Sequence, residues 1–276
     1  MNRSNNLFPQ NHSNSAAQTD NTKNSDSRLV VRTLLIMETI AYNANPLGIN
    51  QLAKLTGLNT TTAFRICKTL CNYGWLTQDS AGRYYIGINA YLVGKKYNIY
   101  DDLVLVSAEP MKTLAKNVKQ PVNLMAVKGT DCYLINQIMG NRGFSGLSPN
   151  GSSRPMHIVA AGKAILSTYE DKQLEIMLDS FDYYPYTPNS VTNKEDLRKQ
   201  ILQAREDGYA TEYQESNWGC CCVAVPVFNE HNMVCAALSI SMITEYASFT
   251  KLYAEKLLET SKKITLQLAE YHAGKK

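Results

Sequence analysis

Apolar residues recur at helical spacing from about Leu29 onward and predict two short helices at the start of the folded sequence. The first helix is predicted from the spacing of Val30, Leu34, Met37, Ile40 and Ala41 and ends before the break at 43–46. The second has Asn50 as its expected N-cap and Gly57 as its closing residue.

A third helix is predicted from about 60 to 73, because Ala63, Ile66 and Leu70 form an apolar stripe. Two strand-like segments follow at 75–78 and 83–86, separated by a turn sequence that predicts a β-hairpin. Three helices followed by a hairpin are typical of a winged helix-turn-helix. A connecting helix is expected over 88–97.

The second half of the sequence alternates differently. A hairpin is predicted from 121–128 and 132–138, followed by a loop rich in Gly, Ser and Pro at 141–155. The remaining predicted elements are helices at 156–168, 171–179, 193–207 and 248–271 and strands at 208–215, 220–228 and 234–242. Strands joined by short turns predict an antiparallel sheet covered by helices, an α+β sensor-type domain.

Length and composition divide the chain further. At 276 residues it can hold two domains. The first residues are crowded with Asn, Ser, Thr and Gln and have few aliphatic side chains to bury. We therefore expect a disordered tail at 1–27, a winged helix-turn-helix at 28–87, a linker helix at 88–100 and the sensor-type domain at 101–276.

The charge is uneven along the chain. Residues 28–99 carry eight basic side chains against two acidic ones, a net charge of +6, whereas the sequence from residue 100 onward has a net charge of −2. A basic module on a slightly acidic remainder indicates that nucleic acid would contact the first domain only.

The sequence shows neither an apolar signal-peptide core nor a run long enough to cross a bilayer, so we expect a cytoplasmic protein with no membrane partner. Seven cysteines, an odd number, argue against a disulfide framework. Cys67 and Cys71 lack partners at zinc-finger spacing and are interpreted as buried small hydrophobes, so no metal site and no cofactor are expected.

Four groups of residues, in order, resemble the IclR family of transcriptional regulators over about residues 29–270. The four groups include Thr56-Gly57-Leu58 with Gly82–Gly87, Arg154–His157 with Ala161–Ala164, Gly208–Ala210 with Cys222–Phe228, and Ala236–Ser241. The resemblance implies a GAF/profilin-like effector-binding domain with an antiparallel sheet after the winged domain. It also implies a homodimer or homotetramer on a double-stranded DNA operator.

A recognition helix presents its N-terminal turn to base edges, where short hydroxyl side chains approach closely and Arg contacts guanine or phosphate. The residues expected to contact DNA are Thr60, Thr61, Thr62, Arg65, Lys68 and, from the wing, Arg83. Phe64 is expected either to contact a thymine methyl or to be a slightly exposed core residue.

The resemblance also implies an effector site. The turn at Ala160 and Ala161 would contact a carboxylate through backbone N–H groups, while the acidic, thiol and hydroxyl positions of the family pattern map to Glu212, Cys222, Ser239 and Ser241. We expect a small organic acid, with a sugar acid favoured over an aromatic hydroxy acid, and control of a catabolic operon.

Three further features of the second domain allow more than one interpretation. His157 could polarise a carboxylate or be an ordinary structural histidine, and Lys163 is expected to be a solvated or loop-anchoring cation. The cysteines at 220–222 allow a thiol redox-sensing regulator, although packing is the simpler interpretation and alternation separates Cys221 from the other two. A small-molecule enzyme is disfavoured because the sequence lacks a catalytic motif.

Overall fold

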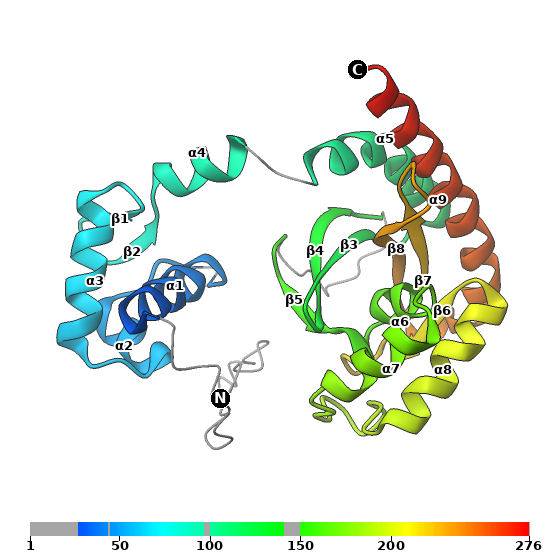
Figure 1. The fold of residues 1–276 in the computed structure, drawn as a ribbon, viewed down its shortest axis with the longest axis horizontal. Helices are drawn as coiled ribbons and strands as arrows, with labels where there is room; N and C mark the ends of the chain where they lie inside the picture. Colours follow the sequence, from blue (N-terminus) through cyan, green and yellow to red (C-terminus); the bar gives the residue numbers. More distant parts are fainter. Residues whose placement is uncertain (1–26, 44, 97–99, 141–149, 276) are drawn as a thin grey trace. The chain divides into compact units, whose positions relative to one another are not determined.

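The computed structural model describes residues 27–43, 45–96, 100–140 and 150–275. The chain divides into two compact units, Met1–Lys96 and Tyr97–Lys276, each drawn in Figure 1. The boundary falls inside the expected linker at 88–100. The expected tail at 1–27 lies outside the described residues, except for Ser27, and is not assessed.

The first unit contains the three helices and the hairpin that the sequence predicts, so the winged helix-turn-helix is confirmed. Its elements are α1 (Arg28–Ala41), α2 (Ile49–Thr56), α3 (Thr60–Asn72), β1 (Leu76–Gln78), β2 (Tyr84–Ile86) and α4 (Ile88–Lys96). β1 pairs with β2 in antiparallel register, and Leu47 adds an isolated bridge to Tyr84.

A small core holds these elements together, with Ile36, Leu52, Ala63 and Cys67 fully buried or nearly so. Gly57 closes α2 in the left-handed conformation (φ 67°), as the sequence predicted.

The expected N-cap of α2 is wrong, because the helix begins after Gly48 and Asn50 already lies inside it. The backbone N–H of Gly48 donates to the side chain of Gln51 at 2.9 Å. This reach-back bond satisfies an exposed donor, so the helix can begin earlier without a capping side chain at residue 50.

The second unit is built on a six-stranded sheet whose neighbouring strands are all antiparallel, in the order β5-β4-β3-β8-β7-β6. The strands are β3 (Val122–Lys128), β4 (Asp131–Ile138), β5 (Ser153–Pro155), β6 (Ala210–Tyr213), β7 (Cys220–Phe228) and β8 (Val234–Ile243). The strand β5 lies where the sequence predicted only loop. β6 is shorter than predicted, because Gly208 ends the preceding helix and Gln214 has a positive φ of 56°.

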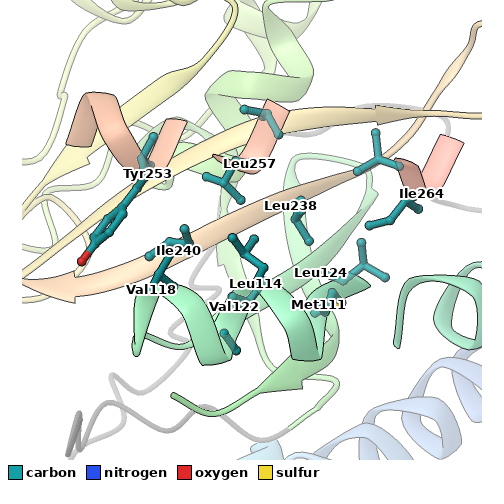
Figure 2. Packing of buried hydrophobic residues seen from close by; sticks show 14 of the residues in the cluster. Met111, Leu114, Val118, Val122, Leu124, Leu238, Ile240, Tyr253, Leu257 and Ile264 are labelled. Atoms are coloured by element: carbon teal, nitrogen blue, oxygen red, sulfur yellow. The ribbon is translucent and has the colours of Figure 1, made fainter. Parts of the chain in front are cut away.

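One face of this sheet is covered by α5 (Asp101–Val118) and α9 (Thr250–Ala273), the latter preceded by the short helix η2 (Thr244–Phe249). Figure 2 shows Leu114 of α5 and Leu257 of α9 packed against strand residues that include Leu238. The sequence pattern predicts no element over residues 101–118, although seven residues of α5 are buried.

The other face is covered by α6 (Ala160–Leu166), α7 (Asp171–Ser180) and α8 (Lys194–Asp207). The single helix predicted over 156–168 is wrong, since a short 3-10 turn, η1 (Met156–Ile158), precedes α6 and Val159 between them is extended. Among the described residues, no helix combines the length and the apolar character needed to span a membrane.

Candidate functional site

The helix α3 presents the residues that the sequence assigned to DNA contact. Its N-cap, Asn59, accepts a hydrogen bond from the backbone N–H of Thr62 at 2.7 Å, which fixes the first turn. Ala63 and Cys67 face the core, so the opposite face, with Arg65 and Lys68, is exposed. Thr60 and Thr61 are also exposed, whereas Thr62 is half-buried.

Phe64 lies on the exposed side of α3 with 48% of its surface accessible. A core residue of this size would be largely covered, so the structure excludes the interpretation of Phe64 as part of the core. An exposed aromatic ring beside Arg65 is available for contact with a thymine methyl.

The wing residue Arg83 is exposed but not free. Its guanidinium pairs with the carboxylate of Asp79 at 2.8 Å, and the other Asp79 oxygen accepts the backbone N–H groups of Ala81 and Arg83. The backbone bond from Arg83, with its side-chain bond, lowers the pKa of Asp79. A phosphate contact by Arg83 would therefore compete with an existing partner.

In the second unit, polar side chains from five strands form a continuous row across the face that α6 to α8 cover. We call it the polar strip, and its members are Gln137, Asn123, Ser239, Ser241, Cys222 and Glu212. The strip results from strand register, because Glu212 lies opposite Cys222, Cys222 opposite Ser241, and Asn123 opposite Ser239.

Hydrogen bonds connect the strip. The amide of Gln137 donates to the side-chain oxygen of Asn123 at 2.6 Å, and the Asn123 amide donates to Ser241 at 2.9 Å. The Cys222 thiol lies 3.4 Å from the Ser241 hydroxyl. Four residues assigned from sequence are thus brought together, and two further members, Asn123 and Gln137, were missed.

A signal for Asn123 was present in the sequence. It stands between Val122 and Leu124 in a strand that is otherwise almost entirely apolar, and alternation places it on the opposite face from both. A buried amide of this kind needs a polar partner, which Gln137 and the two serines provide.

Glu212 is 2% exposed, and one of its oxygens accepts the backbone N–H of Glu215 at 2.9 Å. Burial raises the pKa of Glu212 to about 7, against the lowering effect of that hydrogen bond. Because one oxygen already holds the turn after β6, only part of this carboxyl group is available for a ligand hydroxyl.

Lys163 is not a solvated cation, since it is 1% exposed and its ammonium group lies 2.5 Å from the carboxylate of Glu215. Burial lowers the pKa of Lys163, and the nearby carboxylate of Glu215 opposes that effect. The pair ties α6 to the turn after β6, so Lys163 serves as an anchor.

Ala160 and Ala161 form the first turn of α6 and are buried. Both belong to the apolar cluster that also contacts Cys222, which places the turn over the same face as the polar strip. A helix of seven residues has a small dipole, so any attraction for a carboxylate would come from its local N–H groups.

His157 is fully buried in η1, with its ring centroid 5.6 Å from that of Phe181 and 5.5 Å from that of Tyr183. Burial lowers its pKa to about 4. These surroundings favour the structural interpretation of His157.

This burial predicts a pH dependence. The unfolded chain binds a proton at His157 near pH 6.5 and the folded chain only near pH 4, so stability present above pH 6.5 is lost as the pH falls, by about 3 kcal/mol in all. Urea unfolding between pH 7.5 and 4.5 should show a smaller loss for His157→Asn than for the wild type.

The surface variant His231→Asn, whose native side chain is 69% exposed, is the control and should follow the wild type. If His157→Asn and the wild type lost stability in parallel over this range, protonation of His157 would not contribute.

The three consecutive cysteines alternate as the sequence predicted, with Cys221 in the core beneath α5 and α9 and Cys222 on the opposite face. Burial raises the pKa of Cys221 to about 12. The pKa of Cys222 is also raised, by its hydrogen bond with Cys220 and by burial. Thiols with raised pKa values carry little thiolate at neutral pH, which disfavours the redox-sensing alternative.

A winged helix-turn-helix joined to a helix-covered antiparallel sheet defines the chain as a DNA-binding regulator with a ligand-sensing domain. Comparison with known families agrees: "IclR helix-turn-helix domain" matches residues 29–80, and "Bacterial transcriptional regulator IclR C-terminal" matches residues 97–266. The chain belongs to the IclR family of transcriptional regulators.

Individual relatives support this assignment. The chain is 31% identical over 218 residues to the HTH-type transcriptional regulator XynR of Escherichia coli K12, covering 78% of this chain and 86% of XynR. It is 28% identical to the acetate operon repressor of Salmonella typhimurium, covering 77% and 78% of the two chains. These relatives are regulators, and the chain is a transcriptional regulator rather than an enzyme.

Among solved structures, an IclR homologue from Microbacterium hydrocarbonoxydans complexed with 4-hydroxybenzoate superimposes with a TM-score of 0.77. The match covers 87% of this chain and 98% of the homologue at 20% identity, so it shows a shared fold.

Proposed function

We propose that this regulator binds its operator through α3 and represses a catabolic operon in the cytoplasm until a small organic acid binds the second unit. The observation that carries the DNA part is the exposed outer face of α3, with Arg65 and Lys68 beside a capped first turn. Thr60, Thr61, Thr62 and Phe64 would contact bases or phosphates, and Arg83 would contact the backbone after leaving Asp79.

Replacement of Arg65 by alanine should weaken operator binding by about 1–3 kcal/mol, roughly 5- to 150-fold, if the guanidinium contacts a base. The measurement is fluorescence anisotropy with the full chain and a duplex that the wild type selects from random sequence. The affinity of the wild type should also fall steeply as salt rises, because phosphate contacts release counterions.

The control is Arg198→Ala, which removes an arginine from α8 in the other unit and should bind DNA as the wild type does. An unchanged affinity in Arg65→Ala, or wild-type binding that does not depend on salt, would contradict the role of α3.

We further propose that the regulator acts as a homodimer or homotetramer. Two helices of the first unit support this, since Leu29 and Leu34 of α1 and Ile88, Tyr91 and Leu92 of α4 are each more than half exposed. Exposed apolar residues in such number usually mark contact surfaces. A monomer in sedimentation at micromolar concentration, with DNA binding intact, would contradict the proposal.

For the effector we propose a hydroxylated carboxylic acid, with a sugar acid favoured and an aromatic hydroxy acid second. The polar strip supports the first choice, because it spreads amide, hydroxyl and carboxyl groups over five strands as a chain of hydroxyls requires. The homologue bound to 4-hydroxybenzoate supports the second. Backbone N–H groups at Ala160 and Ala161 would contact the carboxylate, with Glu212, Cys222, Ser239 and Ser241 contacting the rest of the acid.

A thermal-shift screen of aldonic, keto-deoxy sugar and hydroxybenzoic acids should identify the effector as a concentration-dependent rise in melting temperature. The double variant Ser239→Ala/Ser241→Ala should lower the affinity for the acid that binds best by about tenfold or more, since each lost hydrogen bond contributes about 0.5–1.5 kcal/mol.

The matched control is Ser180→Ala, because Ser180 is an exposed serine on α7 that bonds only its own helix. Pyruvate and glyoxylate are the small-acid controls. If only these two stabilise the protein, or if the double variant responds like Ser180→Ala, the assignment of the strip as effector site is wrong.

A further inference from the structure

Three side chains that can bind a metal ion converge between β6 and β7. The carboxylate of Glu212 and the thiols of Cys220 and Cys222 each offer a ligand atom, and these atoms all lie within 4.8 Å of one another. This is the separation from which small side-chain rotations bring one carboxylate oxygen and two sulfurs onto a single ion.

Strand register fixes this arrangement. Glu212 stands directly opposite Cys222 in the antiparallel pair β6–β7, where facing side chains share one side of the sheet. Cys220 is two residues from Cys222 on the same strand and therefore lies on that side as well. Three ligands thus come from two paired strands, which are rigid elements rather than a loop.

The carboxyl group of Glu212 is also held in place. One of its oxygens accepts the backbone N–H of Glu215 at 2.9 Å, and the other accepts the Ser216 hydroxyl at 3.4 Å. The carboxyl group also has a hydrogen bond with the thiol of Cys222, one of the other two ligands. A ligand that is 2% exposed and oriented in this way loses little conformational freedom when it binds an ion.

The charged groups nearby do not prevent a cation from binding. Lys163 interacts electrostatically with both Glu212 and Cys222, but its ammonium group is bound to Glu215 at 2.5 Å, so its charge is already compensated. A divalent ion held by one carboxylate and two thiolates would reduce their summed charge from about −3 to about −1, which lowers the cost of burying the three ionised ligands.

We propose that Glu212, Cys220 and Cys222 form a binding site for Zn²⁺. Thiolate sulfur favours a borderline-soft d10 ion over Mg²⁺ or Ca²⁺, which require oxygen ligands. Binding replaces the two thiol protons, which pass to the buffer, and involves no change of oxidation state. Three protein ligands leave one tetrahedral position open for water or a ligand oxygen.

The full chain, reduced with a phosphine and stripped of metal by a chelator, should bind one Zn²⁺ per chain in competition with a chromophoric chelator. Substitution with Co²⁺ should give a thiolate-to-metal charge-transfer band in the near ultraviolet and tetrahedral ligand-field bands in the visible. Glu212 and Cys222 are also proposed effector contacts. Each measurement is therefore made without effector, so that a failure to bind Zn²⁺ can be distinguished from a failure to bind the acid.

Cys220→Ser and Cys222→Ser should each weaken Zn²⁺ binding by about 100-fold or more, because loss of a direct ligand should exceed the 10- to 100-fold cost of losing an outer-shell partner. The matched control is Cys235→Ser, a partly buried cysteine on β8 whose thiol contacts the carbonyl of Val227 and should leave binding unchanged. Cys220 is only partly buried at the start of β7, so its variant is expected to fold even if Cys222→Ser does not.

The proposal is overturned if the wild type binds no stoichiometric Zn²⁺, or if Co²⁺ gives no charge-transfer band. It is also overturned if folded Cys220→Ser binds as tightly as Cys235→Ser.

Discussion

Replacement of Lys163 by methionine should destabilise the second unit by about 3–5 kcal/mol, because it leaves the buried carboxylate of Glu215 without its partner. Methionine keeps the apolar stem of the side chain, so the loss of stability reports the missing ammonium charge rather than a new cavity. The turn after β6 should loosen with it, since Glu215 and Glu212 both hold that turn. Urea unfolding followed by far-ultraviolet circular dichroism provides the measurement.

The double variant Lys163→Met/Glu215→Leu is the decisive comparison. An apolar pair of similar volume should recover most of the loss, because neither charge is then buried alone. The matched control is Lys112→Met, which removes an exposed pair with Glu109 and should cost about 0–1 kcal/mol. If Lys163→Met cost no more than Lys112→Met, the buried pair would not anchor α6.

Gly162→Ala should destabilise the protein by about 3 kcal/mol or more, the upper part of the range for overpacking. A Cβ atom at residue 162 would lie 2.2 Å from the carbonyl oxygen of Met156 and 2.5 Å from its Cα. Both are backbone atoms, so the clash can be relieved only by moving η1 away from α6. Because that movement displaces Ala160 and Ala161, effector stabilisation in the thermal-shift assay should fall as well.

Gly94→Ala is the control for the glycine substitution itself. Gly94 lies inside α4, and an added Cβ would have no atom within 4 Å apart from its chain neighbours and the backbone of its own helix. Alanine should therefore be neutral or stabilise that helix by up to about 1 kcal/mol. If Gly162→Ala behaved like Gly94→Ala, the close packing of η1 on α6 would not be needed for stability.

The sequence by itself determined the winged helix-turn-helix and most of the sheet. Their patterns are local: an apolar stripe at helical spacing on α3, the turn between β1 and β2, and alternation along β7 and β8 each depend on a few neighbouring residues. The four groups of residues that resemble the IclR family also occur in the family's order, and the family assignment is confirmed.

Local pattern failed where a segment's environment is set by distant residues. The pattern over residues 101–118 predicts no element, yet α5 packs against a sheet formed later in the chain. The predicted helix over 156–168 is interrupted because Val159 has an extended backbone conformation. This break lets η1 pack closely against α6 at Gly162.

Tertiary structure alone decided the chemistry of the site. Strand register brings Asn123 into hydrogen-bond distance of Ser241, which is 118 residues away in the sequence. Helix packing brings Lys163 to Glu215, which is 52 residues away. Burial then changes what these groups do, since the same lysine would be an ordinary solvated cation on the surface. Residue type can be read from sequence, but distance and exposure, which fix charge state and partner, arise only when the sheet and its helices assemble.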